Sequence, residues 1–325
     1  MEAYYEFERP ITNLEKKISD LKEMSVQEKM DFTTEIGALE KKLEQLIEET
    51  YANLTPWQRV QLSRHPQRPY AEDYIQHLFT DFQELHGDRK FRDDSAIIGG
   101  LARFRGMPVL VIGQQKGRGT KEKMKRNFGM VKPEGYRKAI RLMEMASRFS
   151  VPIITLVDTP GAYPGIDAEE RGQSEAIADS IMRMFDLRVP VISVVIGEGG
   201  SGGALAIAVA DRVLMQEFST YSVISPESCA SILWSDSAMC EQAAKVLKLS
   251  APEVKKLGVI DDIVREPQGG AHRNHEEASV LLGDAIHKQL EMLLSKSGES
   301  LVQDRIARFR SMGTDTIIST GKDSK

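Results

Sequence analysis

Residues 189–210, VPVISVVIGEGGSGGALAIAVA, constrain the fold of this chain more than any other stretch. The apolar, β-branched run 191–196 predicts a buried strand. Five glycines then occur within the seven positions 197–203, and small residues follow at 204–210, which predicts a turn and a tightly packed helix. The first N–H groups of a helix lack intrahelical acceptors, and glycines allow a ligand to approach the backbone closely. The stretch therefore predicts an anion or oxyanion site built from main chain.

The same glycine run matches a dinucleotide-binding fingerprint. Its pattern is Gly197-x-Gly199-x-x-Gly202, and Glu217 lies 20 residues after Gly197, where such proteins place an acid for the ribose. In the usual dinucleotide fold, however, the fingerprint opens the first strand–helix unit of the domain. Here it comes in the third such unit, which weakens this interpretation without excluding it.

A serine-hydrolase interpretation rests on the overlapping pattern Gly199-x-Ser201-x-Gly203, which fits a nucleophile elbow. Three histidines lie downstream as candidate bases: His272, His275 and His287. The simpler explanation of Ser201 is a turn serine. A strand, a Gly-Gly pair and a helix also fit the oxyanion hole of enzymes that stabilise enolates. Close helix–strand packing would explain the glycines without any chemistry, so the run alone does not decide.

Composition places the whole chain among ordinary globular proteins. Its 325 residues are 41% hydrophobic and 28% charged, with a formal net charge of −5, which argues against nucleic acid as the main partner. No run of 18 apolar residues occurs, and the acidic N-terminus lacks the apolar segment of a signal peptide, so we expect no membrane span and a cytoplasmic location. Two cysteines, Cys229 and Cys240, are too few for a disulfide framework or a four-cysteine zinc site.

A repeated unit of proline, strand and glycine-bearing turn organises the middle of the chain. Prolines stand at the entrances of three apolar, β-branched segments, 107–113, 151–158 and 189–197. These prolines, at 108, 152 and 190, lie 44 and 38 residues apart, with helical patterns between them. We therefore expect an α/β fold in which repeated units stack as a spiral or in layers.

Two loops after these strands carry further signals. Between Lys116 and Lys138 stand nine Lys or Arg residues against Glu122 and Glu134, a local charge of about +7 that predicts an anionic ligand or partner. The second strand is followed by DTPGAYPG at 158–165, whose two prolines and two glycines predict a rigid loop. Ligand sites of α/β proteins commonly lie at this carboxyl end of the strands.

The N-terminal part is expected to be a helical arm. Aliphatic residues at helical spacing between 10 and 50, with Ser25 between two runs, predict an antiparallel helix pair for docking or dimerisation. Thr55-Pro56 predicts the start of a further helix. The basic linker that follows, 59–68, is expected to be solvated. Further helical patterns are expected at 70–90, 246–257 and 276–311, strands at 212–225, and a polar, disordered tail beyond Thr314.

Three long, contiguous motifs make the sequence specific. They are VDTPGAYPG at 157–165, VIGEGGSGGALAIAVADRVLM at 195–215 and YSVISPESCASILW at 221–234. Together they resemble the carboxyltransferase α-subunit family of bacterial-type acetyl-CoA carboxylase, over roughly residues 65 to 300.

The resemblance implies a fold and a division of the chain. The fold is α/β, a crotonase-like spiral of ββα repeats with a coiled-coil-like N-terminal arm and C-terminal helices. The arm is expected at 1–55, the carboxyltransferase domain at 56–300, and the end of the C-terminal helix with the polar tail at 301–325.

The resemblance also implies an activity and a site. The family transfers a carboxyl group from carboxybiotin to acetyl-CoA, which gives malonyl-CoA for fatty acid synthesis. On this basis Gly202 and Gly203 are the expected catalytic donors to the biotin oxyanion. The expected substrate-binding residues are Gly161, Ala162, Gly199, Gly200, Lys116 and Arg118.

Partners follow from the same resemblance. The family's α subunit works with a β subunit that carries a zinc ribbon, as an expected α2β2 assembly, so we expect no metal in this chain. The nearest approach to a Met-Lys-Met biotin attachment motif, at 123–126, does not match it, so biotin is expected on a separate carrier protein. ATP would be used only by the partner biotin carboxylase. One departure is Ser228, where the family pattern has glycine; a positive φ there would cost about 1 kcal/mol.

Overall fold

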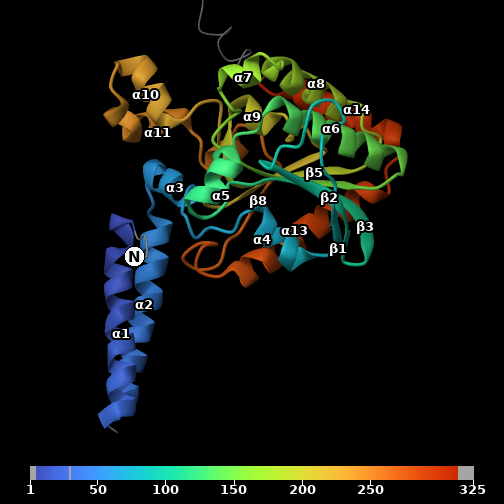
Figure 1. Cartoon of the computed structure of the whole chain (residues 1–325). Coiled ribbons are helices and arrows are strands. Elements are labelled where there is room, and N and C mark those ends of the chain that lie inside the picture. Colours follow the sequence, from blue (N-terminus) through green and yellow to red (C-terminus); the bar gives the residue numbers. More distant parts are fainter. Residues whose placement is uncertain (1–4, 29–30, 314–325) are drawn as a thin grey trace, which may run out of the picture.

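A mixed β-sheet forms the centre of the structure, a computed structural model that describes residues 5–28 and 31–313 (Figure 1). The strand order is β1-β2-β3-β4-β5-β6-β8, and β7 pairs with β5. The pairings from β1 to β3 are antiparallel, and those among β3 to β8 are parallel. The strands are β1 Phe79–Glu84, β2 Ile97–Phe104, β3 Met107–Gln114, β4 Ile153–Thr159, β5 Val191–Gly200, β6 Arg212–Gln216, β7 Thr220–Ser222 and β8 Asp262–Val264.

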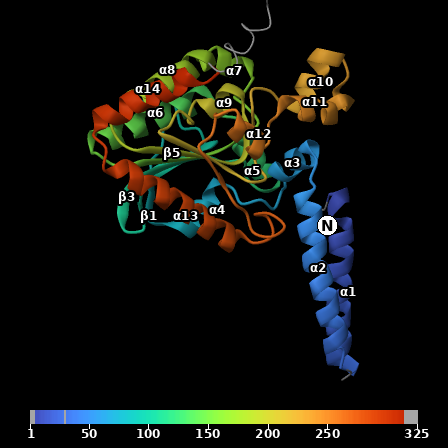
Figure 2. The same ribbon diagram turned by 180° about the vertical axis from the view of Figure 1, so that it is seen from behind.

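Helices cover both faces of this sheet. In Figures 1 and 2, α6, α8 and α14 lie over one face, and α4 and α13 lie over the other. The helices are α1 Arg9–Glu28, α2 Thr33–Ala52, α3 Pro56–Ser63, α4 Ala71–Leu78, α5 Gly119–Lys125, α6 Pro133–Arg148, α7 Ile166–Glu169, α8 Gln173–Phe185, α9 Ser201–Leu205, α10 Pro226–Trp234, α11 Cys240–Leu247, α12 Ala251–Lys256, α13 His275–Leu294 and α14 Gly298–Ser311. None of the helices in the described part of the chain has the length and hydropathy of a membrane span.

The repeat of proline and strand is confirmed. The three segments become β3, β4 and β5, which are parallel neighbours in register, with Leu110 opposite Ile153 and Ile153 opposite Val191. Every residue of β4 is buried, because helices cover both faces of the sheet. The expected strands in 212–225 are also present, as β6 and β7.

The expected glycine turn at 197–203 is partly wrong, because β5 continues through Gly200. The first part of β5 pairs with β6, through Ile192 to Val195, and its end pairs with β7, from Glu198 to Gly200. One long strand thus pairs with two successive strands, while Gly199 in its last part also pairs with Thr159 of β4. The following helix, α9, has only five residues.

Three helical expectations needed correction. The segment 70–90 is helical only to Leu78, and β1 then begins an antiparallel pair with β2. The segment 246–257 contains the end of α11 and all of α12, separated at Lys248, which has a φ of 50°. The segment 276–311 is divided into α13 and α14, because the Ser297 hydroxyl caps a new helix by accepting from the N–H of Ser300.

The helical arm is confirmed as an antiparallel pair, α1 and α2, which projects from the body in Figure 1. Ser25 lies inside α1, which ends at Glu28, so the first helix is longer than expected; α2 begins at Thr33. Ile11, Ile47 and Tyr51 are buried in one cluster with Phe218 of the body. The arm is therefore anchored at its base. The predicted tail beyond Thr314 lies outside the described residues.

The basic linker at 59–68 is not a solvated face. Thr55 caps α3 as expected, with its hydroxyl accepting from the N–H of Gln58. His65 and Arg68 are buried, and Arg68 forms a paired ion bridge with Glu266 at 2.6 and 2.8 Å. The burial is possible because the guanidinium charge is matched by a carboxylate.

Candidate active site

Three charged side chains converge where β3, β4 and β5 end, as expected for neighbouring parallel strands. Lys116 follows β3, while Asp158 lies in β4 and Glu198 in β5. The Nζ of Lys116 lies 2.8 Å from Oδ1 of Asp158 and 2.7 Å from Oε2 of Glu198. The N–H of Glu198 also donates to Oδ1 of Asp158 at 2.9 Å. Their side chains are only 2–12% exposed; we call these three residues the strand-end cluster.

Arg64, at the end of α3, extends the strand-end cluster to α10. Its Nε donates to Oε1 of Glu198 at 2.6 Å. Its guanidinium also forms an ion pair with Glu227 in the first turn of α10. The end of β5 is therefore held from two sides, by Lys116 and by Arg64.

Opposite charges dominate the electrostatics at two members of the strand-end cluster, Lys116 and Glu198, whereas burial dominates at Asp158 and raises its pKa. Burial alone would raise the pKa of Glu198, but Lys116 and Arg64 outweigh it and lower the pKa to about 2. Burial alone would lower the pKa of Lys116, but Asp158 and Glu198 raise it above its ordinary value. Lys116 and Glu198 are therefore both charged at neutral pH.

Several glycines in this region are required by close backbone approach. A Cβ at Gly200 would lie 2.2 Å from the carbonyl oxygen of Pro160, and one at Gly203 would lie 2.5 Å from the backbone N of Ala162. A Cβ at Gly199 would lie 2.6 Å from the Tyr221 ring. The glycines thus bring the loop after β4, which includes Gly161, against the start of α9. The sequence placed Gly161, Ala162, Gly199, Gly200, Gly202 and Gly203 at one site, and the structure brings these residues together.

Gly202 differs from its neighbours because it has room. The nearest atom to a Cβ at Gly202 would be Cγ2 of Ile177, at 3.6 Å. Gly202 and Gly203 are the second and third residues of α9, so their N–H groups have no acceptor within the helix. Two adjacent backbone donors are thereby available at this point, the arrangement that an oxyanion requires.

A pocket of about 360 Å³ opens beside Gly202. Its lining comes from α9, from β7 and the residue after it, and from α11, α12 and the residues that follow them. It is largely apolar, with a few polar groups. The lining residues are Ser201, Gly202, Leu205, Tyr221, Ser222, Val223, Leu247, Lys248, Val254, Leu257 and Val259. An apolar pocket with a small number of backbone donors is typical of ligand sites.

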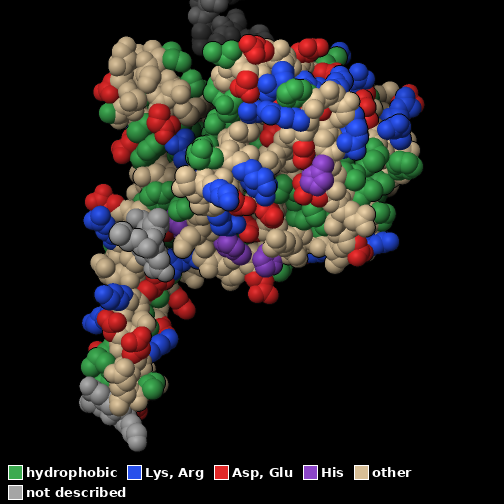
Figure 3. Space-filling model, in the orientation of Figure 1, with side chains coloured by type: hydrophobic (Ala, Val, Ile, Leu, Met, Phe, Trp, Pro, Cys, Tyr) green, Lys and Arg blue, Asp and Glu red, His purple; other side chains and the backbone are tan. Residues whose placement is uncertain are grey.

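The basic segment 116–138 is less free than its sequence suggests. Arg118 pairs with Asp73 at 2.7 Å and lies over the Tyr70 ring. Figure 3 shows Lys and Arg side chains with Asp and Glu side chains between them in the region of α5. Other cations of the segment pair with acids from elsewhere in the chain: Lys116, Arg126, Lys132, Arg137 and Lys138. The expected strong anion attraction is therefore reduced by internal ion pairs.

Among the described residues, Ser201 has no hydrogen bond to any of the three candidate histidines. The three candidate histidines are engaged elsewhere: His272 with Glu8, His275 with the carbonyl of Gln67, and His287 with Glu291. Ser201 has a φ of 53° and stands exposed at the turn from β5 into α9. It is a turn residue, as the simpler explanation held.

The dinucleotide interpretation is also wrong. Gly197 and Gly199 lie within β5 instead of a strand-to-helix turn, and a Cβ at Gly197 would lie 2.3 Å from Oδ1 of Asp158. The space beside Gly197 is therefore filled by a protein carboxylate. Glu217, the expected ribose-binding acid, accepts a hydrogen bond from the N–H of Glu266 at 3.4 Å.

Ser228 causes no backbone strain. It lies in the first turn of α10, where its N–H donates to the hydroxyl of the N-cap Ser225 at 3.2 Å. It is absent from the described residues with positive φ. The expected penalty for replacing glycine here is therefore wrong, since a helical φ suits serine.

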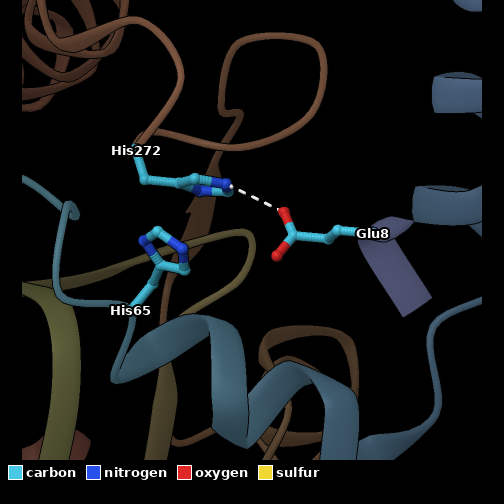
Figure 4. Close-up of side chains that lie close together, drawn as sticks. All are labelled: Glu8, His65 and His272. Atoms are coloured by element: carbon cyan, nitrogen blue, oxygen red, sulfur yellow. Dashed lines mark hydrogen bonds and ion pairs between the residues drawn. The ribbon is translucent and has the colours of Figure 1, made fainter. Parts of the chain in front are cut away.

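Among the described residues, one group of possible metal ligands stands out: Glu8, His65 and His272, whose ligand atoms lie within 4.8 Å of one another (Figure 4). Two of the three, Glu8 and His272, are hydrogen-bonded to each other. Nε2 of His272 lies 3.1 Å from the Glu8 carboxylate and therefore donates to it, while Nδ1 of His65 accepts from the N–H of Gln67 at 3.2 Å, so the proton of a neutral His65 is on Nε2. Glu8 and His272 thus form a hydrogen-bonded anchor for the arm, and the His65 ring packs against that of His272 with centroids 4.1 Å apart.

The fold has known counterparts among solved structures. The transcarboxylase 12S structure, crystallised with methylmalonyl-coenzyme A and methylmalonic acid, aligns with a TM-score of 0.58 and 20% identity over 70% of this chain and 42% of that one. The β subunit of Pseudomonas aeruginosa geranyl-CoA carboxylase aligns with a TM-score of 0.53 and 18% identity over 72% of this chain and 44% of that one. The chain thus has the crotonase-like fold of the carboxyltransferases.

Sequence comparison narrows this class to a family. The model described as acetyl co-enzyme A carboxylase carboxyltransferase-like matches residues 4–313. The acetyl-coenzyme A carboxylase carboxyl transferase subunit alpha of Geobacter metallireducens is 59% identical, over 94% of this chain and 96% of that protein. The corresponding subunit of Hydrogenovibrio crunogenus is 56% identical, over 95% and 97%. This chain belongs to the family of acetyl-CoA carboxylase carboxyltransferase α subunits.

Sequence reasoning missed four charged residues of the site: Arg64, Asp158, Glu198 and Glu227. Two of them carried a visible signal. Asp158 ends an apolar strand, and Glu198 is the one charged residue within the glycine run. Arg64 and Glu227 are distant in sequence from both, so only the fold brings them to the strand-end cluster.

Proposed function

We propose that this chain supplies one side of a shared carboxyltransferase site, at which a carboxyl group passes from carboxybiotin to acetyl-CoA and malonyl-CoA is formed. Membership of the family and the two backbone donors at the start of α9 support this reaction. Biotin, bound to a carrier protein, would supply the activated carboxyl group. The malonyl-CoA would serve fatty acid synthesis.

The roles of the chain's own residues follow from where negative charge forms. The N–H groups of Gly202 and Gly203 would donate to the ureido oxygen, because charge accumulates there as the carboxyl group leaves. The loss of one such donor typically raises a barrier by about 3–4 kcal/mol. Gly161, Ala162 and Gly200 would shape the backbone wall beside these donors, since each lies at the contact between β5, α9 and the loop after β4, and Gly199 would shape it on the side of Tyr221.

The observation that carries the proposal is the contrast between Gly202 and Gly203. Gly203 is fixed against the loop after β4, whereas Gly202 borders the apolar pocket. The backbone of Gly202 thus borders the cavity, and that of the adjacent Gly203 is held in place behind it. Preorganised donors of this kind stabilise a developing anion without a reorganisation cost.

Partners are part of the proposal. The chain would work with a zinc-ribbon β subunit, in an α2β2 assembly, with a biotin carboxyl carrier protein, and with a biotin carboxylase that alone uses ATP.

The surface and the cysteines of the chain fit this setting. The thiols of Cys229 and Cys240 form no disulfide, which suits a reducing cytoplasm. The apolar side chains exposed on α10 and after β7 (Val223, Ile232 and Leu233) would suit a partner surface.

Reconstitution tests the proposal. The chain is mixed with a β subunit of this family, and malonyl-CoA decarboxylation is measured in the presence of free biotin. We expect activity from the mixture and none from either subunit alone. Activity of this chain alone would contradict a shared site, and an inactive mixture of two folded subunits would contradict the reaction.

A further inference from the structure

Lys116 was expected to hold an anionic substrate, but its surroundings do not suit that role. Two of the three donors of its ammonium group are used, by Asp158 at 2.8 Å and Glu198 at 2.7 Å. A substrate carboxylate or phosphate would have to approach against both of these acids. Lys121, on the neighbouring α5, is exposed and lies outside this cluster.

The protein also makes room for this arrangement by omitting side chains. A Cβ at Gly197 would lie 2.3 Å from Oδ1 of Asp158, and one at Gly129 would lie 2.8 Å from Cγ of Lys116. Gly129 has a φ of 83°, a conformation that favours glycine. Both glycines therefore fit around the strand-end cluster as a packed unit.

The strand-end cluster acts directly on the backbone that leads to the site. Oδ1 of Asp158 accepts the N–H of Glu198, so one carboxylate oxygen holds both Lys116 and the main chain of β5. The carboxylate of Glu198 is held in turn by Lys116 and Arg64. Gly202 follows Glu198 by only four residues, so a shift of this strand end would move the donors of α9.

We propose that Lys116 is a positioning residue: with Asp158, Glu198 and Arg64 it fixes the end of β5, and thereby the backbone donors of Gly202 and Gly203. The inference rests on the proposed function for its effect on catalysis, but its structural part does not depend on that function. Misplacement of reacting groups by about 1 Å can cost about 100-fold in rate. Lys116 thus contributes to the rate without contacting the substrate.

The experiment uses the reconstituted pair of subunits and three variants. Lys116→Met removes the charge and keeps most of the volume. Glu198→Gln is milder, because the amide oxygen can still accept from Lys116. Lys121→Met is the matched control, since it removes an exposed lysine of the same basic segment. Each is assayed for kcat and KM in malonyl-CoA decarboxylation with free biotin, and hydrogen–deuterium exchange is measured over 196–206.

A positioning role predicts a specific pattern. Lys116→Met should lower kcat about 100-fold, change KM for malonyl-CoA less than about threefold, and accelerate exchange over 196–206. Glu198→Gln should change the same quantities in the same direction, by less. Lys116→Met/Glu198→Gln should lose less than the product of the two single losses, because both substitutions disturb one unit. Lys121→Met should resemble the wild type in every measurement.

Other results would overturn the inference. A large rise in KM with unchanged kcat and unchanged exchange would show that Lys116 contacts the substrate. If Lys116→Met does not fold, Glu198→Gln decides by the same criteria. If the wild-type pair is inactive, the proposed function fails, and the exchange data alone decide whether Lys116 positions the end of β5.

Discussion

At the scale of single residues, the glycines of the site have different tasks that their spacing does not reveal. Gly200 and Gly203 permit two backbones to touch, since any Cβ there would collide with Pro160 or Ala162. Gly202 has no such neighbour within 3.5 Å and stands beside the pocket. A close backbone contact and an open position beside the pocket are therefore found at two adjacent residues.

Substitution by alanine should separate these tasks. Gly203→Ala places a methyl group 2.5 Å from backbone that cannot move aside, so we expect a loss of at least about 2–3 kcal/mol in the free energy of unfolding. Gly202→Ala should change it by less than about 1 kcal/mol, because its Cβ meets only Ile177 at 3.6 Å. Urea unfolding of both variants measures the difference. Equal losses would contradict the close contact seen at Gly203.

Ser201→Ala should leave carboxyl transfer within about threefold of the wild type, because the hydroxyl has no histidine partner in the structure. A nucleophilic serine would instead lose about 10⁶-fold in kcat on such a change. The measurement is malonyl-CoA decarboxylation by the reconstituted pair, alongside labelling by a fluorophosphonate probe. Stoichiometric labelling of Ser201 would restore the hydrolase interpretation.

At the scale of elements, one buried carboxylate helps to join the arm to the body, beside the apolar cluster at its base. Glu8 accepts from the Tyr51 hydroxyl of α2 at 2.7 Å, from His272 of the body at 3.1 Å and from the N–H of Tyr5 at 3.2 Å. Burial would raise the pKa of Glu8, but these hydrogen bonds lower it to about 2. One ionised side chain thus joins three segments.

The attachment of the arm should therefore weaken in acid. A carboxylate whose pKa falls from 4.5 to about 2 on folding contributes stability above pH 4.5, and loses it as the pH drops from about 4.5 toward 2. The full contribution is roughly 3 kcal/mol. Hydrogen–deuterium exchange over 5–12 between pH 7 and pH 3, corrected for intrinsic rates, should show this opening. In Glu8→Gln, exchange over 5–12 should already be fast at pH 7, whereas the exposed control Glu6→Gln should exchange as the wild type does. Equal exchange profiles for the two variants would refute the role of Glu8 as an anchor.

Elements with strong local signals were predictable from the sequence, and elements set by tertiary contacts were not. Proline at a strand entrance and a β-branched run located β3, β4 and β5, because both signals lie within a few residues. β1 looked helical, since its apolar residues continue the spacing of α4, and only its pairing with β2 makes it a strand. The glycine positions of the site were likewise predictable from a contiguous motif, while the ion pairs of Arg64 depend on α10 and β5 meeting in space.

At the scale of the whole molecule, both ends of the described chain are fastened by a buried charge. Glu8 joins the N-terminal arm to the body, and Arg305 joins α14 to it. The guanidinium of Arg305 donates to the carbonyls of Met184 and Leu187, at 2.6 and 2.9 Å, and pairs with Asp211 at 2.8 Å. The boundary expected at residue 300 thus falls inside a helix that belongs to the body.

Removal of the buried Arg305–Asp211 ion pair should destabilise the entire domain. Arg305→Met leaves Asp211 as an unpaired buried carboxylate, so we expect a loss of about 3–5 kcal/mol in the free energy of unfolding. The matched control is Arg310→Met, an exposed arginine of the same helix, which should cost less than about 0.5 kcal/mol. Chemical denaturation of the full chain compares the two. Similar small losses for both variants would mean that α14 is peripheral and that the core of the fold ends before it. A large loss confined to Arg305→Met would instead place α14 within the cooperative unit that holds the start of β5.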